Sequence, residues 1–310
     1  MKTGLNNRGV SLIELLIVMA ILGFLTVMMV SSYALMVKYA IRTRVTAKTE
    51  GESITVIWPL FKEVESAGFG VPSSGTCTPA ISLSGDTLTI HSTASGDEKG
   101  SGSWSFISDG CAVDNTSVSK IAFGQYAVVI DPGSKARLAL SNIQSSTYII
   151  DYPGSECTWV GKLAYRVPDG GLECYETKFT LRSYASGSRP NLCDTNTFKL
   201  TRSVAKDAGN DSFQPVADCV LTLKYRFGCI NKTSGALTWR ADSTCTASEG
   251  ILKFVRVGML IQATPKIATQ EPASITLFQD AATPETITLT SDQRYYKWKM
   301  IDRTIPLRNM

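Results

Sequence analysis

Residues 9–30 read GVSLIELLIVMAILGFLTVMMV, and Glu14 is the only charged residue between Arg8 and Lys38. A helix needs about 20 apolar residues to cross a bilayer, so this run is long enough. A charge at the centre of such a helix costs about 2.5 to 3.5 kcal/mol on insertion scales, and an intramembrane ionisable group is by default a functional-site hypothesis. The stretch therefore predicts a membrane-spanning helix in which Glu14 has a specific role.

The short segment before this helix, Met1 to Gly9, carries Lys2 and Arg8 and no acidic residue. Basic residues ahead of a membrane helix hold that end in the cytoplasm, so the bulk of the chain is expected outside it. An ordinary secretory signal has small residues of the A-x-A type after its apolar region, and no such site is evident here. We therefore expect the helix to stay attached to the mature chain.

The residues around Glu14 also form a motif. Gly9, Val10 and the run Ser11-Leu12-Ile13-Glu14-Leu15 resemble the prepilin signature of type IV pilins and type II secretion pseudopilins. The resemblance implies that a prepilin peptidase cuts after Gly9 and that the new amino terminus, Val10, is N-methylated. It also implies that Glu14 meets the terminal amine of a neighbouring subunit during assembly. Val10 stands where phenylalanine is commonest and Ser11 where threonine is common.

This pairing has a physical reason, because a carboxylate and an ammonium compensate each other where either alone would be costly to bury. The pair would also fix the stagger of packed helices. The alternative is an uncleaved signal anchor in which Glu14 lies near the membrane interface.

Beyond Val37, charged and apolar residues mix in a pattern typical of an amphipathic helix, which we expect to continue to Gly70. Its apolar stripe should pack on a sheet, and we assign to it Ile41, Val45, Ile54, Ile57, Trp58, Phe61 and Val64. Four basic residues should face solvent or neighbouring subunits: Lys38, Arg42, Arg44 and Lys48. Pro59 lacks a backbone donor, so a kink or break is expected near Thr55 to Trp58. The glycines in 67–70 should end the helix.

After residue 70, short β-strands are separated by clusters of Gly, Pro, Ser and Asp. The turn signal Pro168-Asp169-Gly170-Gly171 predicts a hairpin, and a tight one would keep Cys157 and Cys174 from pairing directly. Residues 92–110 are rich in Ser and Gly and should form a surface loop. The expected strands are 80–91, 121–130, 137–140, 148–152, 162–167, 172–181, 220–227, 236–239, 252–261, 275–278 and 286–289.

All eight cysteines lie beyond the apolar segment: Cys77, Cys111, Cys157, Cys174, Cys193, Cys219, Cys229 and Cys245. An even number on the exported side predicts four disulfides, each stabilising by about 2 to 4 kcal/mol. Many pairings are possible, and the most local are Cys77 with Cys111 and Cys229 with Cys245. Reduced thiols or a metal site are the alternative, which is disfavoured because the chain has no C-x-x-C pair and one histidine, His91.

The inventory of reactive residues disfavours an enzyme, and we expect no cofactor. A Ser-His-Asp arrangement would have to use His91, which lies in a predicted strand beside Ser92. Asp207, Asn210 and Asp211 offer oxygens suited to calcium but lack the spacing of an EF-hand, so a solvated loop is favoured over a metal site. The formal charge of +4 falls to +2 once Lys2 and Arg8 leave with the leader, so no nucleic-acid partner is evident.

A cluster of basic and aromatic residues near the carboxyl end could be read as a nucleic-acid surface. Its alternating pattern fits better a strand with basic groups on one face and aromatics on the other. The basic members are Arg294, Lys297, Lys299, Arg303 and Arg308, and the aromatic members are Tyr295, Tyr296 and Trp298.

A second resemblance narrows the family. Glu63-Val64-Glu65-Ser66-Ala67-Gly68-Phe69-Gly70 is similar to the end of the helix in PilW-type minor pilins. Looser matches follow in the same order, at 163–167, 214–220, 224–228, 252–257 and 303–309. About residues 75–160 show no such resemblance.

These resemblances imply an α+β type IV pilin fold, with a long helix packed on a disulfide-stabilised, β-rich head. The expected parts are a leader (1–9), a membrane and assembly helix (10–37), its amphipathic continuation (38–70) and the head (71–310). The implied function is a minor pilin that primes or caps a type IV pilus (fimbrium). Its partners would be major and minor pilins, the prepilin peptidase, the inner-membrane assembly platform and membrane lipid. The alternatives are a minor pseudopilin of a type II secretion system and a pilus-tip adhesin.

Overall fold

In the computed structural model, most of the chain forms one long helix and a β-rich domain. The residues described are 12–72, 75–94, 104–113, 126–134, 137–144, 149–150, 153–167, 174–205, 211–267 and 270–309. Two compact units are present, residues 1–51 and 52–310. An apolar helix followed by a β-rich domain with four disulfides agrees with the predicted α+β class.

The helix α1 runs without interruption over Leu12–Ser66, although Pro59 lies inside it. The predicted break near Thr55 to Trp58 is therefore wrong, whereas the predicted kink stays a prediction. Residues on both sides of Pro59 are anchored in the core, since Ile57 and Leu60 are each 0% exposed. This packing offsets the lost backbone hydrogen bond. The helix ends where predicted, because Gly68 and Gly70 have positive φ angles of 79° and 66°.

The buried stripe of the helix differs from the prediction, although Ile57 and Val64 are buried as expected and Phe61 packs against the core. The side chains of Ile41, Val45 and Ile54 lie outside those described. Trp58 is 53% exposed, so it does not belong to the stripe, whereas Leu60 does. The buried positions are Ile57, Leu60, Val64 and Ala67, which follow the three- and four-residue spacing of one helix face. The side chains of residues 38–56 lie outside those described, and with them the predicted basic face.

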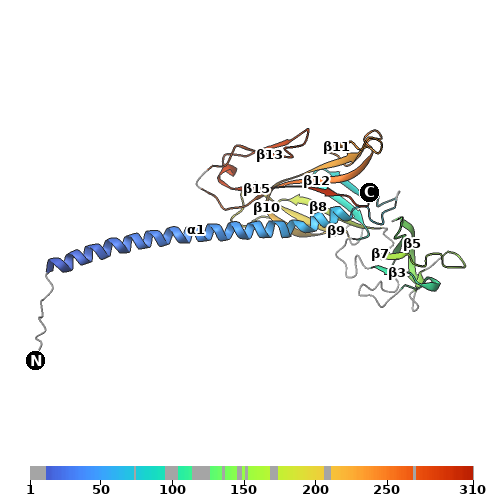
Figure 1. Cartoon of the computed structure of the whole chain (residues 1–310), viewed down its shortest axis with the longest axis horizontal. Helices are drawn as coiled ribbons and strands as arrows, with labels where there is room; N and C mark the ends of the chain where they lie inside the picture. Colours follow the sequence, from blue (N-terminus) through green and yellow to red (C-terminus); the bar gives the residue numbers. More distant parts are fainter. Residues whose placement is uncertain are drawn as a thin grey trace, which may run out of the picture. The chain divides into compact units, whose positions relative to one another are not determined.

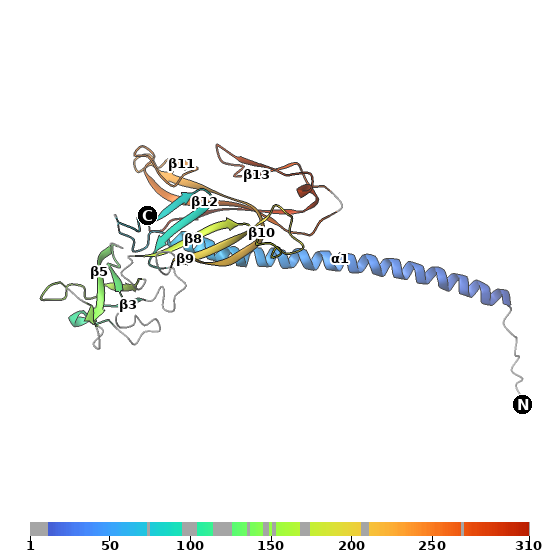
Figure 2. The same cartoon turned by 180° about the vertical axis from the view of Figure 1, so that it is seen from behind.

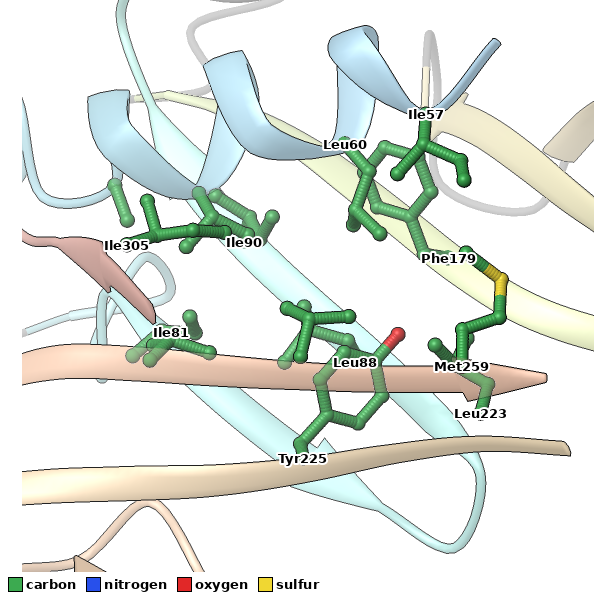
Figure 3. Packing of buried hydrophobic residues seen from close by; sticks show 14 of the residues in the cluster. Ile57, Leu60, Ile81, Leu88, Ile90, Phe179, Leu223, Tyr225, Met259 and Ile305 are labelled. Carbon is green, nitrogen blue, oxygen red and sulfur yellow. The ribbon is translucent and has the colours of Figure 1, made fainter. Parts of the chain in front are cut away.

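This helix face packs on the main sheet of the domain, and Figure 3 shows Ile57 and Leu60 pointing toward Phe179 and Met259. The sheet is antiparallel, in the order β1-β2-β8-β9-β10-β12-β15, with β11 also paired to β10 (Figures 1 and 2). Its strands are β1 (Ile81–Ser84), β2 (Thr87–Ser92), β8 (Tyr175–Arg182), β9 (Phe198–Ala205), β10 (Asp211–Ile230), β11 (Leu237–Arg240), β12 (Ile251–Gln262) and β15 (Trp298–Pro306).

A second, five-stranded sheet has the order β3-β7-β4-β5-β6. Its strands are β3 (Trp104–Phe106), β4 (Tyr126–Ile130), β5 (Arg137–Gln144), β6 (Ile149–Ile150) and β7 (Leu163–Arg166), with the short helix η1 (Asp109–Cys111) after β3. A separate hairpin is formed by β13 (Ser274–Leu277) and β14 (Glu285–Thr288), and the short helix η2 (Gln293–Tyr295) precedes β15.

The strand predictions needed several corrections. The strand expected over 220–227 is much longer, since β10 spans Asp211–Ile230. The strand expected over 80–91 is a hairpin, because Gly85 and Asp86 form a two-residue turn between Ser84 and Thr87. The loop expected over 92–110 contains β3, and β9 was not predicted. The turn predicted at 168–171 falls outside the described residues, whereas the strands on either side of it, β7 and β8, are described.

The eight cysteines form four disulfides: Cys77–Cys174, Cys111–Cys157, Cys193–Cys219 and Cys229–Cys245. The local pair Cys229–Cys245 is present, but the pair Cys77–Cys111 is wrong. Cys77 precedes the β1–β2 hairpin, and Cys174 immediately precedes β8, the neighbour of β2 in the sheet. Pairing of these strands brings the two cysteines together across 97 residues of sequence.

Candidate functional site

The first half of α1 presents apolar side chains on all sides. Leu15–Tyr33 has a mean hydropathy of 2.5 and is 0% buried within the protein. Large apolar residues along Leu12–Val37 are 37% to 79% exposed. A surface this apolar is unfavourable in water and indicates contact with lipid or with other apolar helices.

Two hydroxyl groups in this segment are satisfied by the helix itself. Thr26 Oγ1 donates to the Leu22 carbonyl at 2.7 Å, and Ser31 Oγ donates to the Val27 carbonyl at 2.9 Å. Such bonds to the preceding turn remove the cost of placing a hydroxyl in hydrocarbon. The segment is therefore suited to a bilayer despite its polar residues.

The predicted prepilin residues lie at the amino end of this segment. Gly9 and Val10 fall outside the described residues, so cleavage and methylation there stay predictions. Glu14 belongs to the backbone of α1, in the first turn described, and its side chain is not among those described. The amino end of a helix carries partial positive charge and favours a carboxylate. Its contact with a partner's amine stays a prediction.

A buried ion pair joins the last turns of α1 to the main sheet. Arg202 Nε on β9 donates to Glu63 Oε1 at 2.6 Å, and Arg202 Nη2 also contacts this oxygen. Glu63 is 8% exposed and Arg202 9%. Buried charges need such a partner, because removing each ion from water costs several kcal/mol. The pair fixes the position of the helix end on the sheet.

This ion pair explains why β9 was missed in the sequence. On β9 the residues Phe198, Leu200, Arg202 and Val204 alternate along one side of the strand, and Leu200 and Val204 are fully buried. Arg202 thus occupies a core position that an apolar residue would normally hold. The sequence did contain a signal for both β9 and its ion pair. That signal is an arginine in an otherwise apolar alternation, together with an acid on the apolar face of a helix.

The carboxyl end of the chain contacts the same part of α1. The Arg303 guanidinium lies 5.6 Å from the Phe61 ring centroid, and Arg308 pairs with Glu65 at 2.5 Å. On β15, Lys299 and Arg303 share a side with Ile301 and Ile305, which pack against the main core. Trp298 lies on the opposite side, so the predicted division holds for the cluster residues within β15. Arg294 and Tyr295 instead lie in η2, and Tyr296 and Lys297 lie between η2 and the strand.

His91, the only histidine, is held between two acceptors. Its Nδ1 lies 2.8 Å from the Pro79 carbonyl and its Nε2 lies 3.2 Å from Glu176 Oε2. Burial lowers the pKa of His91, but the hydrogen bonds to Glu176 and Pro79 outweigh it and raise the pKa above its ordinary value. The bond from His91, with help from Lys178, lowers the pKa of Glu176 to about 2. This arrangement favours a charged structural pair.

A metal site is not among the described side chains, since nowhere do three or more His, Cys, Asp or Glu residues lie together in a suitable cluster. Asp207 and Asn210, the predicted oxygen-rich loop, lie outside the described residues, and Asp211 begins β10.

Comparison with known proteins identifies the amino-terminal segment. The family model of the prokaryotic N-terminal methylation motif matches residues 4–30. No curated protein and no solved structure matches the chain. The match contains Gly9, Val10 and Glu14 and most of the exposed apolar helix. The chain therefore carries a type IV prepilin-like signal, which indicates a pilin-like or pseudopilin protein that is processed by a prepilin peptidase.

Proposed function

We propose that the protein is a PilW-like minor pilin that primes or caps the assembly of a type IV pilus. The observation that carries the proposal is the methylation motif at residues 4–30 joined to an apolar helix whose side chains are uncovered. A helix of this kind can exchange lipid for the helices of other subunits without changing its own fold. The ordered resemblance of residues 63–70 and 303–309 to PilW-type pilins supports the finer assignment.

The mechanism follows from the cost of the Glu14 charge. In the membrane, the helix stores the subunit with its amino end in the cytoplasm and its domain outside. Cutting after Gly9 creates the Val10 amine, and Glu14 of one subunit then binds the amine of another. Extraction by the assembly platform replaces lipid contacts by contacts between helices. In the proposed pilin fold, residues 52–66 of α1 attach the domain by the buried stripe and the Glu63–Arg202 pair.

The proposal includes a location and a class of protein. The subunit resides first in the bacterial inner membrane with its domain in the periplasm, and later at or near the tip of the fibre. Its role is structural, not enzymatic, and the engagement of both His91 ring nitrogens supports this. The leader is residues 1–9, and the assembly helix begins at Val10.

A minor pseudopilin of a type II secretion system is the second candidate, because the same motif is found in both classes. The two are separated by what fails when the gene is deleted. Loss of surface pili supports the minor pilin, whereas loss of exoprotein secretion with normal pili supports the pseudopilin.

The test of the mechanism compares two single variants in the native strain. Glu14→Ala should be cut normally but incorporated poorly, so that pilus numbers fall. Glu65→Ala removes an acid from the same helix at a position outside the apolar segment and is the matched control. Processing is read from the mass of the membrane protein, and piliation by electron microscopy. Normal pilus numbers in the Glu14→Ala strain would refute the proposed contact.

A further inference from the structure

A pocket of about 560 Å³ lies among the end of α1, the second sheet and the carboxyl end of the chain. This volume falls within the range of about 300 to 1,000 Å³ that is usual for small-molecule sites. Four segments far apart in the sequence line it, around residues 62–69, 130–132, 163–165 and 308–309, together with Ala94 and Trp104. All of them belong to the unit 52–310.

One wall of the pocket is aromatic. Trp104 on β3 and Tyr165 on β7 are directly opposed across the two strands, so their side chains share one face of the sheet. Trp104 is 41% exposed. The ring of Tyr165 packs edge-on against Phe69 at 4.8 Å, and that of Trp104 packs against Phe106 at 5.4 Å. The rings are thus fixed in position, which lowers the entropy cost of binding a ligand against them.

The rim of the pocket is polar and electrically balanced. Its charged residues are two basic, Lys62 and Arg308, and two acidic, Glu65 and Asp131. Glu65 pairs with Arg308 at 2.5 Å, and Asp131 pairs with Lys162 at 3.2 Å. A hydrogen bond from the Gly133 backbone and the Lys162 ammonium lower the pKa of the Asp131 carboxyl, so it remains an acceptor at neutral pH. Asn309 adds an amide that both donates and accepts.

We propose that this pocket binds a neutral saccharide. A sugar ring has an apolar C–H face that packs on aromatic rings and, at its edge, hydroxyl groups that both donate and accept hydrogen bonds. The Trp104–Tyr165 wall matches the face, and the mixed rim matches the hydroxyls. A nucleic acid or polyphosphate would need a surplus of positive charge, and an acyl chain would need an apolar rim.

The inference goes beyond the proposed function, since sugar binding by the domain and assembly by the helix are tested separately. The full chain is purified in a detergent without a sugar headgroup, such as lauryldimethylamine oxide. The probes are maltotriose, cellotriose, triacetylchitotriose and, as the peptide alternative, a trialanine. Binding is followed by saturation-transfer NMR of the probe and by tryptophan fluorescence.

At least one of the three saccharides should bind saturably, and Trp104→Ala should weaken it by about tenfold or more, equivalent to about 1.4 kcal/mol. Trp104→Phe, which keeps an aromatic ring, should bind more tightly than Trp104→Ala. Trp58→Ala is the matched control, because Trp58 is 53% exposed and does not line the pocket; it should bind as the wild type does. Thermal unfolding checks that each variant is folded.

Three results would overturn the inference. The first is that none of the saccharides binds saturably at millimolar concentration. The second is equal binding by Trp104→Ala and the wild type, or an equal loss in Trp58→Ala. The third is Trp104-dependent binding of trialanine in place of the saccharides, which would assign the pocket to peptides.

Discussion

Removing one partner of the Glu63–Arg202 pair is the sharpest test of how α1 is held on the sheet. In Arg202→Met the guanidinium is lost, while the Glu63 carboxylate stays at a position that is 8% exposed. Arg202 contacts Glu63 Oε1 through both Nε and Nη2. Breaking a buried pair in this way costs about 3 to 5 kcal/mol, because the remaining charge is uncompensated.

The double variant Glu63→Leu/Arg202→Met separates the cost of an orphaned charge from the value of the pair. Both replacements are apolar and of similar length, and the site borders the core residues Leu200 and Val64. Replacing a buried pair by apolar residues is often neutral or stabilising. We therefore expect the double variant to be within about 1 kcal/mol of the wild type, or more stable.

The assay is urea unfolding of the full chain in detergent, followed by tryptophan fluorescence. Arg308→Met is the control, because Arg308 pairs with Glu65 but its side chain is 71% exposed, and such surface pairs contribute about 0 to 1 kcal/mol. A loss below about 1 kcal/mol in Arg202→Met would refute the reasoning, since a buried carboxylate cannot lose its partner so cheaply. A double variant as unstable as the single one would show that the pair itself stabilises the junction.

Two further predictions concern the sheet. His91 has a raised pKa and Glu176 one of about 2, against ordinary values of 6.5 and 4.5. The stability from Glu176 is present above pH 4.5 and is lost as the pH falls toward 2, whereas that from His91 is present below pH 6.5 and is lost as the pH rises through its folded pKa. The melting temperature should therefore be highest between pH 4.5 and pH 6.5. In His91→Gln, the fall in melting temperature on the alkaline side should disappear. A melting temperature that depends on pH in the variant as it does in the wild type would contradict this. Gly258→Ala would place a Cβ 2.7 Å from Phe278 Cζ, so a loss of about 1 to 3 kcal/mol is expected, with recovery in Gly258→Ala/Phe278→Leu. Gly133→Ala, whose nearest contact would be 3.5 Å, is the control and should unfold at nearly the wild-type urea concentration.

The helix was the most predictable part of the structure, because its signals are local. Apolar composition, spacing and the glycines at 68 and 70 predict its course and its end. Tertiary packing then overrode two local rules, since Pro59 did not break the helix and Leu60, in place of Trp58, entered the core.

What the sequence could not reveal depends on contacts between distant segments. Arg202 obscures β9 because it interrupts the apolar alternation of the strand. An arginine can occupy this buried position only because Glu63, 139 residues away in the sequence, pairs with it. Cys77 and Cys174 meet because β2 and β8 are neighbours in the sheet, which cysteine spacing does not encode. The aromatic pocket likewise exists only after β3 and β7 pair and the chain end returns to α1.

Glu63 and Glu14 pose the same physical problem at the two ends of α1, and they need different solutions. Glu63 is buried and obtains its cation, Arg202, from its own domain. For Glu14, the nearest basic residue along the mature helix is Lys38, which at 1.5 Å per residue is about 36 Å away. In the proposed maturation, Arg8 leaves with the leader. The remaining cation near the helix start is a Val10 amine, which exists only after Gly9 is cut. A substitution of Gly9 that blocks cutting should therefore hide the effect of Glu14→Ala on assembly. If the variant with both substitutions assembled fewer pili than the Gly9 variant alone, Glu14 would act before maturation.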